Sequence, residues 1–442
     1  MKSGIRRDIC LACVFWASAS SAFAFDHFIM QAPAVSVPAI LARHQLNLES
    51  PPDSHGISIV SQSDVRTADE VVAELQQDPD VLTIEAQNTV NVPELDSSPQ
   101  LNQSTAAILD ALAGTTPVNY FGNSVWSSYV NQIAAGLIRV SDSHELATGI
   151  GVVAVLDTGV DPNHPLIQGS LVPGYDFVND TPFTASEWSD LSSTTSDILG
   201  QPTMTATAVQ VNQSTAAILD QSTAAILDTT LLPASFGHGT MVAGLIHLVA
   251  PTAQIMPIKA FKGDGSADLS DIVRGIYFAV DNGARVINMS FSMSRRSAAL
   301  GGALAYATAN GVVCVASVGN DGIQARRYPA SYPNVIGVAS TDNLDERSTF
   351  SNYGEHLVEI TAPGEGVVTA YPGGHYAVVS GTSFSAPLVS GAMALMLQLD
   401  ISLNQYEATQ GISNAKRLGD EDLGFGRLDL FLALTGLNNP HH

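Results

Sequence analysis

The chain holds an aspartate, a histidine and a serine in three separate glycine-containing segments, and these side chains together can activate a serine as a nucleophile. Asp157 is followed by Thr-Gly, His238 lies between two glycines, and Ser383 lies in the segment Gly381–Pro387. A serine hydroxyl is a weak nucleophile until a base takes its proton, and a histidine oriented by a carboxylate can be that base. The three residue types therefore predict acyl transfer, in the chain order Asp, His, Ser.

Each of the three residues is expected at the end of a strand or at the start of a helix. The apolar run Val152–Leu156 predicts a central parallel strand with Asp157 at its carboxyl end. His238 opens a predicted helix, and apolar residues recur at helical spacing after Ser383 without a charge, which predicts a second, buried helix. Free backbone N–H groups and the positive dipole end at a helix start favour negative charge on a nearby oxygen. Acyl transfer needs such a setting.

The chain beyond His238 alternates predicted helices and strands. The expected elements are a helix over Asp268–Asn282, a strand over Val286–Met289, a helix over Ala298–Asn310 and a strand from Val312. This alternation predicts an α/β fold with a parallel sheet. Catalytic groups in such a fold gather at the carboxyl ends of the strands, where both Asp157 and Asn320 are expected.

Four segments resemble the signature blocks of the subtilisin-like serine proteases, namely those around Asp157, His238 and Ser383 and the stretch Ala316–Asn320. The similarity extends from about Ser141 to Leu434. It implies a subtilisin-like parallel sheet with helices on both faces, and a secreted serine endopeptidase that acts on proteins or peptides and needs no cofactor. In this resemblance Asp157 orients His238, His238 takes the proton of Ser383, and Asn320 helps to hold the oxyanion.

Two other functions stay open at this point. One is a catalytically silent protein with the same fold that binds other proteins or assists their folding. The other is a different serine hydrolase such as an esterase, although that fold requires Gly-x-Ser-x-Gly and the order Ser, Asp, His, and the residues proposed here meet neither requirement.

The resemblance also identifies the expected walls of a primary substrate pocket. These residues are Ser290, Phe291 and Ser292 on an edge that pairs with an extended substrate, Ser317, Val318 and Gly319 on the facing wall, and Arg327 at the floor. Ser292 and Val318 are larger than the residues usual in the family, and a guanidinium pairs well with a carboxylate. The pocket is therefore expected to favour a small or acidic residue on the acyl side of the cut bond, unless Arg327 points to solvent and the pocket is merely shallow.

The N-terminus has the form of a secretory signal over residues 1–24. Basic residues precede a mostly apolar stretch from Ile9 to Phe23, and Ala22-Phe23-Ala24 fits a cleavage site. Export to the periplasm or the outside of the cell is expected, with no stable membrane insertion, because the stretch is short for a spanning helix. Cleavage removes Cys10 and Cys13 and leaves Cys314, in an apolar strand, as a core residue rather than a nucleophile.

Residues 25–95 predict a small α+β domain with the order strand, helix, strand, helix, strand. This layout is similar to the inhibitory propeptides of subtilisin-like proteases, which have a ferredoxin-like fold, cover the active site and assist folding. The resemblance implies that this domain is an intramolecular inhibitor of its own chain. An interaction module that stays attached is the alternative.

A linker over residues 96–140 and a catalytic domain over residues 141–436 are expected to follow. The octapeptide Gln-Ser-Thr-Ala-Ala-Ile-Leu-Asp occurs three times, at Gln103–Asp110, Gln213–Asp220 and Gln221–Asp228. The last two copies lie in an insertion over about residues 177–236, of which Ser186–Thr207 has loop composition without any assignable metal-ligand spacing. Each copy fits a short helix or a short strand, and the repeat is either a neutral duplication or a packing or self-recognition element.

The formal charge of −24 excludes one class of partner. Such an excess of carboxylates repels phosphates and anionic membrane surfaces, so nucleic acid is not an expected partner. The same charge keeps an exported protein soluble.

Overall fold

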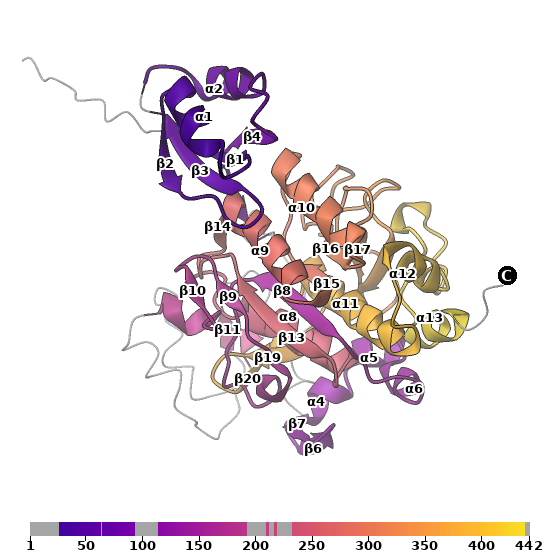
Figure 1. The fold of residues 1–442 in the computed structure, drawn as a ribbon. Coiled ribbons are helices and arrows are strands. Elements are labelled where there is room, and N and C mark those ends of the chain that lie inside the picture. Colours follow the sequence, from indigo (N-terminus) through magenta and orange to yellow (C-terminus); the bar gives the residue numbers. More distant parts are fainter. Residues whose placement is uncertain are drawn as a thin grey trace, which may run out of the picture.

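The structure is a computed structural model that describes residues 26–62, 64–92, 114–191, 209–211, 216–218 and 232–437. Figure 1 shows a small N-terminal domain on top of a larger α/β body. The predicted signal segment and the first and third copies of the octapeptide lie outside the described residues, so the predictions about them stay predictions.

The small domain is a four-stranded antiparallel sheet with the strand order β2-β3-β1-β4. Its elements are β1 (His27–Gln31), α1 (Val37–His44), β2 (Leu46–Ser50), β3 (Ile57–Gln62), α2 (Ala68–Leu75) and β4 (Thr83–Ala86). Side chains alternate between the faces of a strand, so Phe28 and Met30 pack against α1 and α2 whereas Ile29 joins the core of the large body. The sequence prediction missed β2, because only Leu46 of this polar edge strand is buried.

The large body is built on an eight-stranded sheet with the order β10-β9-β13-β8-β15-β16-β17-β18. Its strands are β8 (Val152–Asp157), β9 (Tyr175–Asp176), β10 (Thr181–Pro182), β13 (Gln254–Lys259), β15 (Ala284–Met289), β16 (Val313–Ser317), β17 (Ile336–Thr341) and β18 (Ile360–Pro363). All neighbours pair in parallel except β9 and β10. The predicted α/β fold with a parallel sheet is therefore confirmed.

Helices cover both faces of this sheet, as the sequence predicted. The four long helices are α8 (His238–Val249), α9 (Leu269–Asp281), α10 (Ala298–Ala309) and α11 (Thr382–Leu399). Val153 and Val155 of β8 pack with α8 and α11, whereas Ala154 and Leu156 face the side of α9 and α10. Among the described residues α11 alone is long and apolar enough to cross a membrane, but 89% of its most apolar window is buried in this core.

Cys314 lies on β16 and is fully buried. Burial raises the pKa of its thiol to about 12, because the charged thiolate is disfavoured away from water. The prediction that Cys314 is a core residue and no nucleophile is confirmed.

The second half of the predicted linker is instead part of the large body. Residues 117–144 form β6 (Pro117–Tyr120), β7 (Asn123–Trp126), α4 (Ser127–Val130), α5 (Ile133–Leu137) and α6 (Val140–His144). The Tyr129 hydroxyl donates to the carbonyl of Gly244 in α8 at 2.7 Å, and the Tyr120 hydroxyl donates to that of Leu248. Both rings are buried in the core around α8, so the prediction of a linker over residues 96–140 is corrected for this part.

A second sheet uses part of the repeated octapeptide. Its order is β11-β12-β20-β19, made of β11 (Val209–Val211), β12 (Ala216–Ile218), β20 (His375–Val379) and β19 (Val367–Tyr371). The residues of β12 belong to the second copy and pair antiparallel with β20, with Ala217 opposite Val378. Of the two predicted forms, this copy therefore adopts the strand over these three residues.

Shorter elements complete the described fold. They are β5 (Thr89–Asn91), β14 (Ser266–Asp268), α12 (Gln405–Ile412), α13 (Leu430–Leu437) and the 3-10 helices η2 (Gln168–Ser170), η3 (Glu187–Asp190) and η5 (Glu421–Leu423). β5 follows β4 at the end of the small domain and pairs antiparallel with β14 of the large body, with Val90 opposite Ala267. The two parts are thus joined by a shared two-stranded sheet.

Candidate active site

Asp157 is the last residue of β8, at the carboxyl edge of the sheet, and its side chain is buried. Its Oδ1 accepts hydrogen bonds from Nδ1–H of His238 at 2.7 Å and from the backbone N–H of Thr158 at 2.7 Å. A buried carboxylate is stable only when donors replace the water that it has lost. Both donors lie on one oxygen, which holds the carboxylate toward the imidazole.

His238 is the first residue of α8 and is buried against Phe384 of α11, with 5.5 Å between the ring centres. The glycines on either side are sterically required. A Cβ at residue 237 would come within 2.6 Å of the Tyr371 ring, and one at residue 239 within 1.9 Å of the Gly159 carbonyl oxygen. Only glycine lets the turn after Asp157 and the segment that carries Tyr371 approach the start of α8 this closely.

Ser383 lies in the first turn of α11 and is fully buried. Its hydroxyl donates to the backbone carbonyl of Ser290 at 3.1 Å, and the Ser290 hydroxyl donates back to the Ser383 carbonyl at 2.8 Å. The next residue, Phe384, touches the His238 ring, so the start of α11 and the start of α8 meet at one point. The fold therefore brings all three predicted residues to the carboxyl edge of the sheet.

Asn320 follows β16 and is held by the residue before the serine. Its Oδ1 accepts from the backbone N–H of Thr382 at 2.9 Å and from the Thr382 hydroxyl at 2.8 Å. Because the amide oxygen is committed to these donors, the Nδ2 end of the side chain is the one that can donate to a substrate. The side chain is 7% exposed, as expected for a donor at the base of a cleft.

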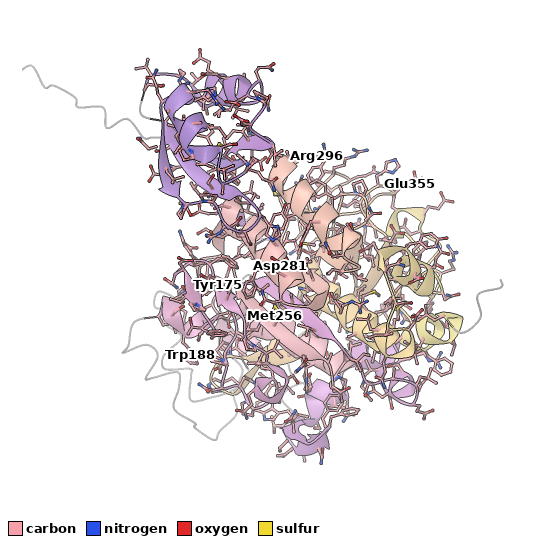
Figure 2. The ribbon with its side chains drawn as sticks, viewed as in Figure 1. Tyr175, Trp188, Met256, Asp281, Arg296 and Glu355 are labelled. Atoms are coloured by element: carbon pink, nitrogen blue, oxygen red, sulfur yellow. The ribbon has the colours of Figure 1, made fainter. Side chains whose placement is uncertain are left out.

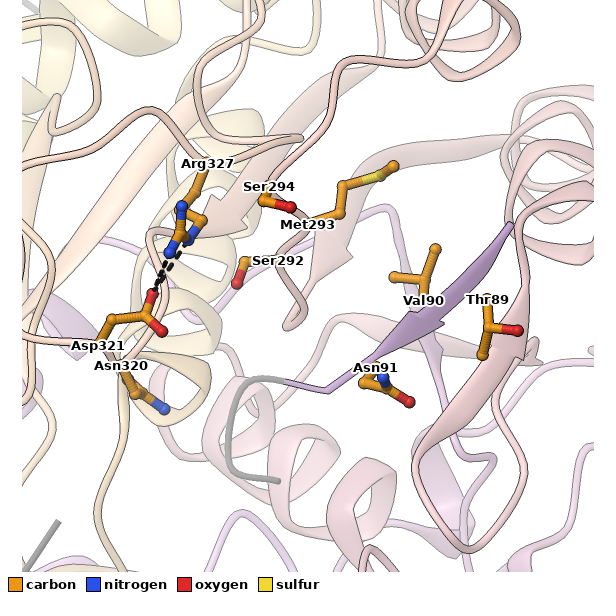
Figure 3. A pocket seen from close by; sticks show the side chains of 9 residues that line it. All are labelled: Thr89, Val90, Asn91, Ser292, Met293, Ser294, Asn320, Asp321 and Arg327. Atoms are coloured by element: carbon orange, nitrogen blue, oxygen red, sulfur yellow. Dashed lines mark hydrogen bonds and ion pairs between the residues drawn. The ribbon is translucent and has the colours of Figure 1, made fainter. Parts of the chain in front are cut away.

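A cavity of about 320 Å³ lies next to Asn320. Figure 3 shows its lining, which is Ser292, Met293, Ser294, Asn320, Asp321 and Arg327 of the large body and Thr89, Val90 and Asn91 of the small domain. Some of the predicted pocket residues line this cavity and others do not. Ser292 and Arg327 line the cavity, whereas the side chains of Phe291 and Val318 are fully buried in the core behind it.

The predicted floor residue Arg327 already has a partner. Its Nε and its Nη2 lie 3.0 and 2.9 Å from Oδ2 of Asp321, the interaction drawn with dashed lines in Figure 3. The same oxygen also accepts from the side-chain amide of Asn352 at 2.9 Å. The sequence prediction did not foresee Asp321, because nothing in the local pattern connects it to a residue six positions later.

Two further features of the site were missed by sequence reasoning. The strand β14, on which the small domain pairs, carries no motif and is only three residues long. Glu187, in the stretch with loop composition, is instead the start of the helical turn η3, and its side chain is fully buried between Thr158 and Gly239. A glutamate in a polar stretch normally signals a solvated surface, so only the fold could reveal this position.

Comparisons with known proteins fit this geometry. The model of the subtilase family matches residues 149–429. The thermitase of Thermoactinomyces vulgaris is 35% identical over 282 residues, which cover 61% of this chain and 84% of that protein. The thermophilic serine proteinase of Bacillus sp. strain AK1 is 33% identical over 286 residues, which cover 64% of this chain but 61% of that protein.

A solved structure shares the fold over most of the chain. Fervidolysin from Fervidobacterium pennivorans, described as a keratinolytic enzyme related to subtilisin, superposes with a TM-score of 0.67 at 22% sequence identity. The match covers 93% of this chain and 61% of fervidolysin. The chain thus spans less than two thirds of the length of fervidolysin and of the Bacillus proteinase.

Proposed function

The chain belongs to the subtilase family of serine endopeptidases, and we propose that it hydrolyses peptide bonds through Asp157, His238 and Ser383. The buried 2.7 Å contact between Asp157 and His238, located where α11 presents Ser383, carries this proposal. A histidine with a purely structural role needs neither a carboxylate on one ring nitrogen nor a helix start that carries a serine beside its ring. A nucleophile, a base and a group that orients the base need this arrangement.

The reaction follows from these positions. Asp157 accepts Nδ1–H, which leaves Nε2 of His238 to take the proton of Ser383 as the oxygen attacks the substrate carbonyl carbon. The C–O bond forms and the carbonyl oxygen becomes negative. His238 then protonates the leaving amine as the C–N bond breaks, and a water molecule hydrolyses the acyl-enzyme by the same steps. Asp157 stabilises the imidazolium in both halves of the reaction.

The test of this proposal is the appearance of new chain ends in an unfolded protein substrate. Mass spectrometry should find internal cleavage products with free amino and carboxyl termini. Products trimmed only from one end, or ester hydrolysis without any peptide cleavage, would contradict an endopeptidase.

Asn320 and the backbone N–H of Ser383 are proposed to hold the oxyanion. The charge exists only in the transition state, so Asn320→Ala should lower kcat by about 10²–10³-fold with little change in KM, the size known for the corresponding loss in subtilisin. Steady-state kinetics on a peptide anilide measure both constants. A rise in KM with kcat unchanged would show that Asn320 binds the ground state instead.

The small domain is proposed to be an inhibitor of its own chain. Its strand β5 occupies β14 as an extended peptide would, and Val90 and Val92 are buried there. Glu85 adds a second anchor, because its carboxylate accepts from the Ser297 hydroxyl at 2.5 Å and from two backbone N–H groups at the start of α10. The residues of β5 also line the cavity that adjoins Asn320.

A third contact fixes the other edge of the small domain. The His55 ring stacks on Tyr277 of α9 at 4.1 Å, and its Nε2 lies 2.7 Å from Oδ2 of Asp281. Figure 2 labels Asp281 near the end of α9, on the side of the body that faces the small domain. Three separated anchors make a rigid docked domain, which is what inhibition requires.

The maturation prediction is self-cleavage between residues 93 and 113, since Val92 is buried on the body before this range, and after it Gly114 is bonded to Ser127 and Tyr129 is packed on the body. The full-length wild type should shorten over time, whereas Ser383→Ala should stay intact. Intact-mass measurement with N-terminal sequencing distinguishes them. Wild-type protein that is active while every chain remains uncut would remove the inhibitor proposal.

Specificity is proposed to depend on the ion pair between Asp321 and Arg327. Because Asp321 neutralises the guanidinium, wild type should prefer a small acyl-side residue with little advantage for an acidic one. Asp321→Asn frees Arg327, so the kcat/KM ratio of Glu over Ala peptides should rise about tenfold. The double variant Asp321→Asn, Arg327→Ala is the control and should return the ratio to the wild-type value. A ratio that Asp321→Asn leaves unchanged would contradict this role.

Export is part of the same proposal. The basic residues, apolar stretch and small-residue cleavage site within residues 1–24 support a secreted enzyme, extracellular or periplasmic. Detection of the mature protein outside the cytoplasm, beginning at Phe25, is the corresponding measurement.

A further inference from the structure

Glu187 connects the two chain segments that carry the proposed acid and base of the triad. Its Oε1 accepts from the Thr158 hydroxyl at 2.5 Å and from the backbone N–H of Gly239 at 3.0 Å. Its Oε2 accepts from the Thr240 hydroxyl at 2.5 Å. The first donor follows Asp157 directly, and the other two follow His238.

We propose that Glu187 is a positioning residue of the triad, which ties the turn after Asp157 to the first turn of α8 and contributes a negative charge next to the segments that carry Asp157 and His238. The inference rests on the proposed function of Asp157, His238 and Ser383. It goes beyond that function, because Glu187 touches none of the reacting atoms and acts through their neighbours.

The hydrogen bonds around Glu187 leave little freedom to the triad. The Thr158 hydroxyl that donates to Glu187 also lies 3.3 Å from Oδ1 of Asp157, so it is packed between the two carboxylates. Thr240 also accepts the backbone N–H of Asp161 at 2.7 Å, beyond the turn after β8. A shift of α8 relative to β8 would break several of these bonds at once, and small displacements of a base are costly for catalysis.

The helix η3 is itself held against the body by a buried ion pair. Nζ of Lys259, which is fully buried, lies 2.5 Å from Oδ2 of Asp190 at the end of η3. The same ammonium donates to the backbone carbonyl of Thr158 at 2.8 Å. η3 thus carries two acids. Glu187 bonds to the turn after Asp157 and to the start of α8, and Asp190 pairs with Lys259.

Several charged or titratable groups face Glu187. They are Asp157 from β8, Lys259 from β13 and Tyr371 from β19. Asp190 of the same helical turn pairs with Lys259, and His238 of α8 pairs with Asp157. Burial raises the pKa of Glu187 to about 7, and the hydrogen bonds from Thr158 and Thr240 oppose that rise. Glu187 therefore changes charge within the range in which such an enzyme can be assayed.

An ionised Glu187 stabilises the imidazolium that forms during each half of the reaction, because opposite charges attract strongly in a buried site. A protonated Glu187 cannot. The increase in kcat that Glu187 provides should therefore be present above pH 7 and be lost as the pH falls through 7. A residue that only shapes the fold would contribute equally at every pH.

The experiment compares full-length wild type and Glu187→Gln from pH 5.5 to 8.5, normalised to active sites by titration with a serine-directed phosphonate. We expect kcat of Glu187→Gln to be about tenfold below wild type at pH 8.5, within about twofold at pH 5.5, and KM to be unchanged. Asp271→Asn is the matched control, because burial also raises the pKa of Asp271 to about 7, although it lies on α9 away from these hydrogen bonds. The ratio of the kcat of Asp271→Asn to that of wild type should not change between pH 5.5 and 8.5.

The outcomes separate the two proposals. If wild type takes up no phosphonate, the proposed function is wrong. If wild type is labelled but the ratio of its kcat to that of Glu187→Gln does not change with pH, this inference alone is wrong. If Glu187→Gln does not fold, Glu187→Asp keeps the charge but is one methylene too short to span both segments. It should then show a lowered kcat with unchanged KM, and wild-type kcat in Glu187→Asp would equally overturn the inference.

Discussion

Replacing Ser383 with alanine is expected to lower kcat by about 10⁶-fold, the size found when a subtilisin loses its nucleophile. The loss is this large because Asp157 and His238 have no role without the hydroxyl that they activate. The residual rate would come from the oxyanion site and from substrate binding. Because Ser383→Ala does not cut itself, its small domain is first removed by a trace of wild-type enzyme that is then inactivated with a serine-directed phosphonate, and a continuous assay with a peptide anilide at high enzyme concentration measures the residual rate.

Ser385→Ala is the matched control for this prediction. Ser385 lies two residues further along α11, is equally buried, and its hydroxyl donates to the Ala362 carbonyl at 3.0 Å. Removing that hydroxyl tests the loss of one buried serine from the same helix turn and should leave kcat within a few fold. A comparable loss in both variants would mean that α11 is merely sensitive to substitution.

Replacing Asp157 with asparagine is expected to lower kcat by about 10⁴-fold while the chain stays folded. An asparagine side chain can donate to Nδ1, which favours the tautomer with its proton on Nε2, and that tautomer cannot accept the proton of Ser383. The Thr158 N–H contacts the same oxygen as Nδ1, so this orientation of the asparagine also removes its acceptor, and a modest loss of stability should accompany the loss of activity. Kinetics together with thermal unfolding separate these two effects.

A small loss in Asp157→Asn would contradict the account. If kcat fell by less than about tenfold, the contact between Asp157 and His238 would be a structural hydrogen bond rather than a catalytic one. Uptake of the phosphonate at a slower rate, with the same final stoichiometry as wild type, would support the catalytic reading.

The sequence predicts the triad because each of its members is tied to a local signal. An apolar strand ends in Asp157, glycines flank His238, and an uninterrupted apolar helix starts beside Ser383. These signals depend on the backbone within a few residues, and the structure places all three residues at the same edge of the sheet.

What the sequence does not predict depends on contacts between distant segments. Glu187 is polar in a polar stretch, and its burial results from donors at Thr158 and at Gly239, which are 29 and 52 residues away along the chain. The same holds for Tyr120 of β6 and Tyr129 of α4, whose hydroxyls donate to carbonyls of α8 more than 100 residues later. No period of apolar residues within one element encodes such partners.

Arg327 illustrates a different limit. Its place in the lining of the cavity follows from the resemblance to the family, but the effect of its charge depends on Asp321, which the resemblance does not specify. A guanidinium with a carboxylate partner attracts a substrate acid far less than an unpaired one. Specificity therefore has to be derived from the ion pair and not from the single residue.

Covalent labelling can show whether Ser383 is the nucleophile of a serine endopeptidase. Full-length wild type, Ser383→Ala and Ser385→Ala are incubated with a serine-directed phosphonate, and the adduct is located by mass spectrometry of the digested protein. We expect one adduct per active chain on Ser383 in wild type and Ser385→Ala, and none in Ser383→Ala. An adduct on another residue, or equal labelling of Ser383→Ala, would contradict it.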